Sequence, residues 1–161
     1  MDAVLAHPAV ARVRAALAAA DLRSEIVALP GAARTAREAA AFLGCDVASI
    51  ANSLVFRAVA SDAALLVMSS GARRVDAARL AALAGEPVEK ADAEFVRRRT
   101  GFAIGGVAPV GHAGPVRVFV ERSLAACPAL WAAAGHPQTV FRLTYPDLLR
   151  ITAGEEADLA Q

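Results

Sequence analysis

The sequence is poor in cysteine, histidine and aromatic residues, and these scarcities exclude several kinds of site. Two cysteines, Cys45 and Cys127, are too few for a disulfide framework and lack the paired spacing of a metal site. The three histidines, His7, His112 and His136, are scattered, with no nearby carboxylate that would complete a ligand set. We therefore expect no metal, no cofactor and, by default, a protein of the cytoplasm.

Long apolar runs are also missing, although 57% of the residues are hydrophobic. Much of this fraction is alanine in helical windows, and charges interrupt every segment that approaches the roughly 18 residues needed to span a bilayer. The first residues, MDAVLAHPAVARVRAAL, place their arginines inside an amphipathic pattern, which is not the charge order of a signal peptide. We expect a soluble protein with no membrane partner.

An excess of positive charge is absent as well, because 17 lysines and arginines face 16 acidic residues and leave a formal charge of +1. Any contact with nucleic acid must therefore rest on local groups of arginines. The candidates are Arg57, Arg73, Arg74 and the run at 97–99. The alternative is that these are ordinary solvated arginines, and the run also suits the negative end of a helix dipole.

Local patterns predict a single domain over residues 1–161, in which helices and strands alternate. Capping and periodicity predict helices over 8–21, 35–44, 76–85, 92–101 and 145–154. Apolar or alternating segments predict strands over 24–30, 52–60, 63–70, 116–121 and 139–144, with a short one at 87–91. A helix broken at Pro128 is predicted over 123–135, the strand at 116–121 is expected to have one polar face, and residues 155–161 look dispensable. Short hairpins and crossovers together indicate an α/β domain with a mixed sheet.

A glycine-rich segment, TGFAIGGVAPVGH at 100–112, offers almost no acid, base or nucleophile among its side chains. Glycine lets a backbone approach a ligand closely, and a glycine pair followed by proline can fix several N–H groups toward one point. Such a cradle binds an anion or a developing oxyanion. The pattern is neither a P-loop nor a dinucleotide fingerprint. A tight structural turn is the alternative.

Four blocks of sequence, in this order and spacing, resemble the YbaK/ProX family of free-standing relatives of the editing domain of bacterial prolyl-tRNA synthetases. They are TAREAAAFLGCDVASIANSLVFRA, LLVMSSGARRVDAARLAAL, RTGFAIGGVAPVGH and AGHPQTVFRLTYPDLLRIT. The resemblance covers roughly residues 10–153. It implies a curved mixed sheet surrounded by helices, and trans-editing, which is hydrolysis of the ester joining a wrong small amino acid to a tRNA. The implied partner is the acceptor end of the tRNA, and help from a synthetase or elongation factor is left open.

The resemblance also implies site residues. The family's glycine-x-x-x-proline loop corresponds to Gly105, Gly106, Val107, Ala108 and Pro109, whose backbone would hold the ester for attack. The residues implied to line the substrate pocket are Ser70, Gly71, Phe102, His112, Gly135 and His136. Open alternatives are a plain turn at 70–71 and a surface or packing role for the histidine at 112.

One position departs from the family pattern. Asn52 stands where most members have a lysine, and an amide carries no charge for catalysis or for a phosphate. It can still donate a hydrogen bond or position a water. The chain is then either an active aminoacyl-tRNA deacylase anchored by Asn52 or a catalytically weakened tRNA-binding or regulatory module. Asn52 as a simple cap, and a small-molecule esterase as the activity, are further alternatives.

Overall fold

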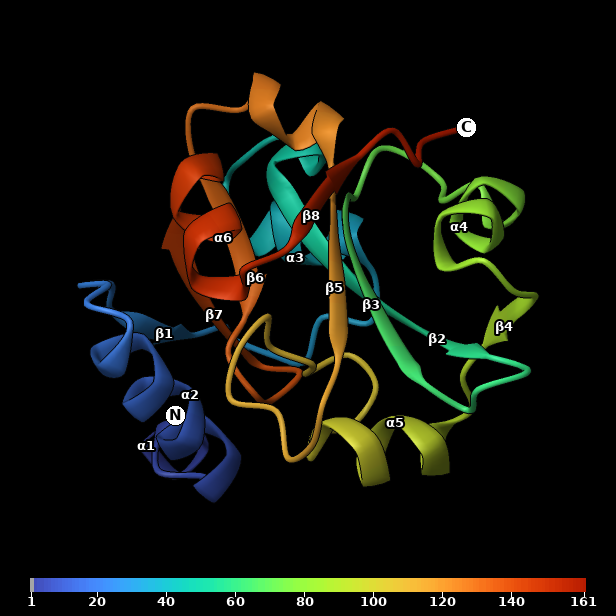
Figure 1. Cartoon of the computed structure of the whole chain (residues 1–161). Coiled ribbons are helices and arrows are strands. Elements are labelled where there is room, and N and C mark those ends of the chain that lie inside the picture. Colours follow the sequence, from blue (N-terminus) through green and yellow to red (C-terminus); the bar gives the residue numbers. More distant parts are fainter. Residues whose placement is uncertain (1) are drawn as a thin grey trace.

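The chain folds around one mixed sheet of eight strands, seen in a computed structural model that describes residues 2–161 (Figure 1). The strand order is β1-β7-β6-β2-β3-β5-β8, and β4 pairs with the end of β2. The strands are β1 (Ile26–Ala28), β2 (Ile50–Ala58), β3 (Ala64–Ser70), β4 (Val88–Lys90), β5 (Arg117–Glu121), β6 (Leu130–Ala133), β7 (Thr139–Leu143) and β8 (Glu155–Ala157). The predicted α/β class with a mixed sheet is thereby confirmed.

Local capping signals set the ends of the helices. The helices are α1 (Asp2–Leu5), α2 (Pro8–Ala19), α3 (Ala36–Leu43), α4 (Ala77–Ala84), α5 (Ala93–Thr100) and α6 (Tyr145–Thr152). The side chain of Thr35 accepts a hydrogen bond from the amide of Glu38 at the start of α3, and Asp76 and Asp92 cap α4 and α5. Each of these three helices ends at a glycine with positive φ, which an L-residue adopts only with strain. No helix in residues 2–161 is long and apolar enough to cross a membrane.

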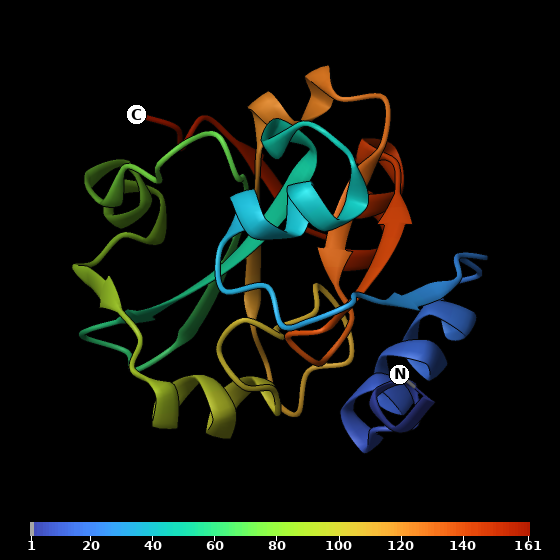
Figure 2. The same ribbon diagram turned by 180° about the vertical axis from the view of Figure 1, so that it is seen from behind.

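The helices cover both faces of the sheet (Figures 1 and 2). Apolar side chains of α2, α5 and α6 pack with β2, β3 and β5 in the largest core cluster. On the other face, α4 packs over the opposite sides of the same three strands, and α3 packs on Ile50 and Trp131. The strand at the centre, β3, is therefore buried along all seven of its residues.

The sheet is split beside β2, and this split positions the site. β6 pairs with β2 only at Ile50 and Ala51, while β4 pairs with it only at 56–58. The edge of β2 between them, over 52–54, therefore has no strand partner on the side opposite β3. The glycine-rich loop after α5 lies next to this open edge, since Ser53 and Gly105 line the same cavity.

Residues 123–135 do not form the predicted broken helix. A 3-10 turn covers Arg122–Ala126, and residues 130–133 form β6, which inserts between β2 and β7. Proline at 128 ends the helical turn, as expected, but the following alanines then join the sheet. Pairing with two distant strands overrides the helical propensity of alanine here.

The C-terminal segment is structural, contrary to the prediction that 155–161 is dispensable. β8 pairs in parallel with β5, and Leu159 is fully buried. The carbonyl of Leu159 also accepts a hydrogen bond from the amide of Asp76, at the start of α4. β3 and β8 flank the two edges of β5, and the two core clusters cover its two faces, so residues 118–121 are all buried and the predicted polar face is absent.

Candidate functional site

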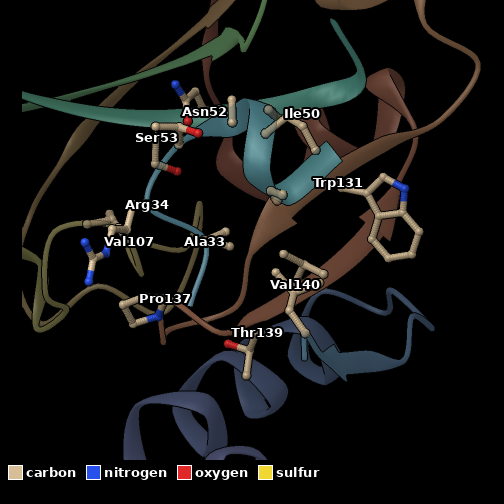
Figure 3. A pocket seen from close by; sticks show the side chains of 18 of the residues that line it. Ala33, Arg34, Ile50, Asn52, Ser53, Val107, Trp131, Pro137, Thr139 and Val140 are labelled. Carbon is tan, nitrogen blue, oxygen red and sulfur yellow. The ribbon is translucent and has the colours of Figure 1, made fainter. Parts of the chain in front are cut away.

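A cavity of about 240 Å³, which we call cavity A, opens where the start of α3, the free edge of β2 and the glycine-rich loop meet. Asn52 and Ser53 form one wall, and Val107 and Pro137 face them (Figure 3). Arg34 lies near this end of the cavity, and Trp131 lies at the opposite end. Three of the four sequence blocks that carry the family resemblance therefore meet around one space, whereas the block at 65–83 contributes no residue to its lining.

The loop of the glycine-x-x-x-proline pattern lies against the turn that follows β6. Gly105 has a φ of +90°, which favours glycine, and it lines cavity A. Gly106 is packed so closely that an added Cβ would lie 2.9 Å from the Cα and carbonyl carbon of His136. Val107 is buried with its neighbours Ala108 and Pro109. Glycine is thus required at position 106 because the backbone there packs directly against the backbone of His136.

Only part of this loop is free to bind a ligand through its amides. The N–H of Gly106 donates to the carbonyl of Ala103 at 2.9 Å, so it is occupied within the loop. Within residues 2–161, the N–H groups of Gly105 and Val107 have no hydrogen-bond partner, and both residues line cavity A. The donors available for an oxyanion are therefore these two amides.

Asn52 lines cavity A from inside β2, two residues after the strand begins. It pairs with Ser69 of β3 and therefore does not cap a strand or helix end. Its amide side chain is half-buried and has no partner among the described residues, so it is free to donate to or accept from a ligand.

The residue across from Asn52 carries an unusual polar group. Ser69 is 1% exposed, and its hydroxyl is the one buried side-chain polar atom of residues 2–161 that lacks a hydrogen-bond partner. Directly opposed residues of an antiparallel pair place their side chains on the same face. Ser69 therefore lies beside Asn52 on the same face of the sheet, where an unpaired hydroxyl has a cost in stability.

None of the six expected pocket residues lines cavity A, and three of them are fixed within the fold behind it. The hydroxyl of Ser70 donates to the carbonyl of Ala48 and accepts from the amide of Ala72, which fixes the end of β3. Gly71 packs under α3, where an added Cβ would lie 2.6 Å from the Cβ of Ala36. Phe102 is 1% exposed and belongs to the main core. All three shape the surroundings of the cavity from behind its walls.

His112 supports the loop instead of facing the cavity. Its Nε2 lies 2.7 Å from the carbonyl oxygen of Ala108, and its ring meets the face of Phe102 edge-on. Burial lowers the pKa of His112, while the hydrogen bond to the Ala108 carbonyl acts in the opposite direction. The neutral imidazole is therefore favoured, with its proton on Nε2.

The turn after β6 supports the glycine-rich loop through the backbone of His136, whereas the imidazole ring of His136 makes other contacts. Its Nδ1 accepts from the amide of Gln138 at 3.0 Å, and its ring lies beside His7. Burial lowers the pKa of His136, and the charge of His7 adds to the effect. Gly135, with a φ of +104°, packs against the backbone of Ala9. The loop thus rests on the backbone at 136, next to Pro137 in the cavity wall.

The three expected RNA-binding arginines lie in different settings. Arg57 is ion-paired with Asp62 at 2.6 Å and with Glu89 at 2.9 Å. Arg73 and Arg74 are exposed on the turn before α4 and form no ion pair within the described chain. Those two guanidinium groups are therefore available to a partner, whereas the first is already engaged.

Sequence reasoning missed Arg34, which is exposed at cavity A. The capping box beginning at Thr35 was visible in the sequence, but its position over the edge of β2 depends on tertiary packing. Arg34 is the only ionisable side chain among the described residues that line cavity A, and no group of three potential metal ligands occurs in residues 2–161. The cavity therefore offers main-chain donors, one amide and one cation, without a nucleophile and base pair.

The comparisons agree with this geometry. A protein of Bacillus subtilis (strain 168), YwhH, whose function is uncharacterised, is 29% identical over 114 residues, which are 71% of this chain and 72% of that protein. A crystal structure of a proposed trans-editing enzyme for prolyl-tRNA synthetase is 40% identical, with a TM-score of 0.90 over 96% of this chain and 98% of that one. The crystal structure of the hypothetical protein APE2540 is 26% identical, with a TM-score of 0.87 over 93% of this chain and 99% of that one. Because residues 31–151 also match the family described as the aminoacyl-tRNA editing domain, the chain belongs to that family.

Proposed function

We propose that this protein is a trans-acting aminoacyl-tRNA deacylase that hydrolyses the ester between a small, wrongly attached amino acid and tRNA. The observation that carries this proposal is that Gly105 and Val107, whose amides have no hydrogen-bond partner in residues 2–161, line cavity A together with Asn52 and Ser53. Family membership and the 40% identical trans-editing enzyme support it.

The chemistry requires positioning more than reactive side chains. A water attacks the ester carbonyl, the oxyanion accepts hydrogen bonds from the amides of Gly105 and Val107, and the bond to the ribose oxygen then breaks. The proton lost by the water passes to the departing ribose oxygen, which yields free amino acid and tRNA. Asn52 positions the carbonyl or the water through its amide.

Small lining residues support a preference for a small amino acid. Ala33, Ala36 and Ala39 form part of the wall of cavity A beneath α3. An apolar pocket separates substrates that differ by one methylene by only about 1–3 kcal/mol, so discrimination among small amino acids is graded.

The partner in this proposal is the acceptor end of a tRNA in the cytoplasm, aided by a synthetase or an elongation factor. Arg73 and Arg74 are the cations best placed to meet its phosphates, because they are exposed and carry no ion pair in residues 2–161. Arg57 can contact the RNA only if its ion pairs with Asp62 and Glu89 break.

A second candidate function is a catalytically weakened tRNA-binding or regulatory module, and the amide at position 52 in place of a lysine favours it. Incubation with a panel of tRNAs charged with Ala, Ser, Thr or Cys separates the two functions. The deacylase requires release of at least one amino acid faster than in buffer. Binding of the tRNAs without any release supports the module, and cleavage of simple amino-acid esters without cleavage of aminoacyl-tRNA supports a small-molecule esterase.

The substitution Asn52→Lys is the internal control for that panel. It adds a charge at the wall of cavity A, so we expect a changed rate or a changed order of preference among the amino acids. Kinetics identical to those of the wild type would exclude a role for this side chain in the reaction.

A further inference from the structure

A second cavity of about 200 Å³, which we call cavity B, lies on the other side of the contact between β2 and the glycine-rich loop. Cavities A and B share five lining residues, which are Ser53, Leu54, Ile104, Gly105 and Val107. The two spaces are therefore neighbouring chambers on either side of one point of contact. An ester held at that point has two substituents, an acyl group and an alcohol, and each requires a space of its own.

The walls of cavity B suit a flat apolar group. Phe56, Val96 and Ala91 line it from the sheet, α5 and the connection between them. The side chain of Ile104, which is 57% exposed, stands between the two cavities. A nucleobase has two apolar faces and gains binding energy by packing them on aromatic and aliphatic side chains.

Unpaired main-chain groups border the same space. In an antiparallel pair, alternate residues direct their N–H and C=O groups to opposite edges of the strand. The carbonyl of Ile50 accepts from Gly71 on the β3 side, so Ser53, three residues later, directs its main-chain groups to the open edge. The side chain of Ser53 is turned to the sulfur of Met68. Its N–H and C=O are thus available to hydroxyls of a ribose or to the edge of a base.

A single free cation marks the mouth of cavity B. Lys90 is the only lysine in the chain, is exposed and lines the cavity. It forms no ion pair in residues 2–161, because neighbouring Glu89 is held by Arg57 and the side chain of Asp92 caps α5. Asp62 and Glu94 are the other acidic side chains at the surface depression beside it, and Asp62 is ion-paired with Arg57 and Arg99. A phosphate carries the charge that complements this ammonium group.

From these four features, and resting on the proposed deacylase function, we propose that cavity B holds the terminal nucleoside of the aminoacylated RNA. The base packs on Ile104 and Leu54, which are the larger of the apolar side chains of cavity B that are not buried, the ribose lies at the main chain of Ser53, and Lys90 binds the phosphate on the 5′ side of that nucleoside. Cavity A then receives the amino acid. Lys90 thereby supplies, from β4, a positive charge that position 52 of β2 lacks.

The presence of one lysine allows a direct test. Periodate converts the terminal ribose of an uncharged tRNA into a dialdehyde, which forms an imine with a nearby amine, with loss of water. Cyanoborohydride then reduces the imine to a stable secondary amine. The aliphatic amines of the 161-residue chain are Lys90 and the N-terminal α-amino group, and we expect peptide mapping to locate the cross-link at Lys90. The variant Lys90→Arg keeps the charge and removes the reactive amine, so it should still bind tRNA and lose this cross-link.

Cross-linking only at the α-amino group, or no cross-link while the tRNA is bound in the same reaction, would overturn the proposal. Kinetics give a second measurement, because Lys90→Gln should raise KM for aminoacyl-tRNA about tenfold with little change in kcat. The same variant should leave hydrolysis of an aminoacyl ester of adenosine, which has no phosphate, unchanged. Arg23→Gln, which removes an exposed cation that lines neither cavity, is the matched control.

The cross-link depends on binding and not on hydrolysis, so failures of the two proposals can be told apart. A cross-link at Lys90 without deacylation of any charged tRNA would remove the enzymatic function and leave the position of the nucleoside intact. Deacylation with no cross-link at Lys90 would leave the enzymatic function intact and remove the assignment of the nucleoside to cavity B.

Discussion

At the scale of single residues, the wall of cavity A combines an unpartnered amide with an unpartnered hydroxyl. Ser69 lies across from Asn52 and has no hydrogen bond, whereas its neighbour Ser70 makes two. A buried hydroxyl without a partner opposes folding, and a bonded one supports it. The two serines therefore form a matched pair for measuring what each hydroxyl contributes.

We expect Ser69→Ala to leave the free energy of unfolding unchanged or to raise it by up to about 1 kcal/mol. Ser70→Ala should lower it by about 1–2 kcal/mol, since the carbonyl of Ala48 and the amide of Ala72 lose their partner. Urea unfolding of both variants measures the difference. A larger loss for Ser69→Ala than for Ser70→Ala would mean that the hydroxyl at 69 has a partner in solution.

Some site residues could be predicted from the sequence at this scale and others could not. Asn52, Gly105 and Val107 line cavity A, as their places in the family's motifs suggest. Phe102 and Gly71 belong to the same motifs but lie behind the cavity wall. A motif identifies the segment that reaches a site, whereas the direction of each side chain depends on packing against distant elements.

At the scale of elements, the glycine-rich loop is held by a titratable group. The hydrogen bond from Nε2 of His112 to the carbonyl of Ala108 links residues 108 and 112 and so closes the C-terminal half of the loop. Because burial lowers the pKa of His112 below its ordinary value of about 6.5, the unfolded chain binds a proton more readily than the folded one. Acidification below that value therefore favours unfolding.

We expect the free energy of unfolding to be nearly constant above about pH 6.5 and to fall as the pH is lowered from there. His112→Gln retains a donor and does not titrate, so its stability should depend less on pH between 5 and 7.5. His136→Gln is the comparison variant, because the pKa of His136 is also lowered by burial. Equal pH dependence in the wild type and His112→Gln would exclude this role of the loop histidine.

The edge strand β8 gives a second test at this scale. Leu159 is fully buried beyond β8, while Leu83 on α4 is 47% exposed. Leu159→Ala should lower the free energy of unfolding by about 2–4 kcal/mol, and Leu83→Ala should change it by less than about 0.5 kcal/mol. Thermal or urea unfolding measures both, and a tolerated Leu159→Ala would restore the view that the last residues are dispensable.

Element boundaries were predictable where the signals are local. Thr35, Asp76 and Asp92 cap the helices predicted from them, because a cap depends on residues three positions away. β6 was missed since its strand character comes from pairing with Ile50 and with β7, which lie far away in sequence. The split beside β2 was invisible for the same reason.

At the scale of the whole molecule, a net charge of +1 restricts RNA binding to local cations. Replacing both Arg73 and Arg74 by Ala should weaken tRNA binding and reduce the slope of log Kd against log salt concentration by about 1 to 2. The control is the pair Arg23→Ala and Arg142→Ala, two exposed arginines at one depression beside β7. Equal slopes for the two double variants would exclude Arg73 and Arg74 as phosphate contacts.

At cavity A, the backbone of the glycine-rich loop is held in place by the backbone of another segment. Gly106 makes this contact with the turn at 136, and an added Cβ would lie 2.9 Å from its main chain. Gly106→Ala must therefore move the loop and its two free amides, at a cost of about 1–3 kcal/mol in stability. Gly114→Ala, whose Cβ would meet only the carbonyl oxygen of Arg99 at 3.6 Å, is the matched control.

The most direct measurement is the single-turnover rate at which these two variants and the wild type deacylate the mischarged tRNA that the wild type cleaves fastest. Backbone catalysis predicts a fall of about 10- to 100-fold for Gly106→Ala, with folding retained by circular dichroism, and a wild-type rate for Gly114→Ala. A folded Gly106→Ala protein that deacylates at the wild-type rate would contradict the assignment of the reaction to this loop.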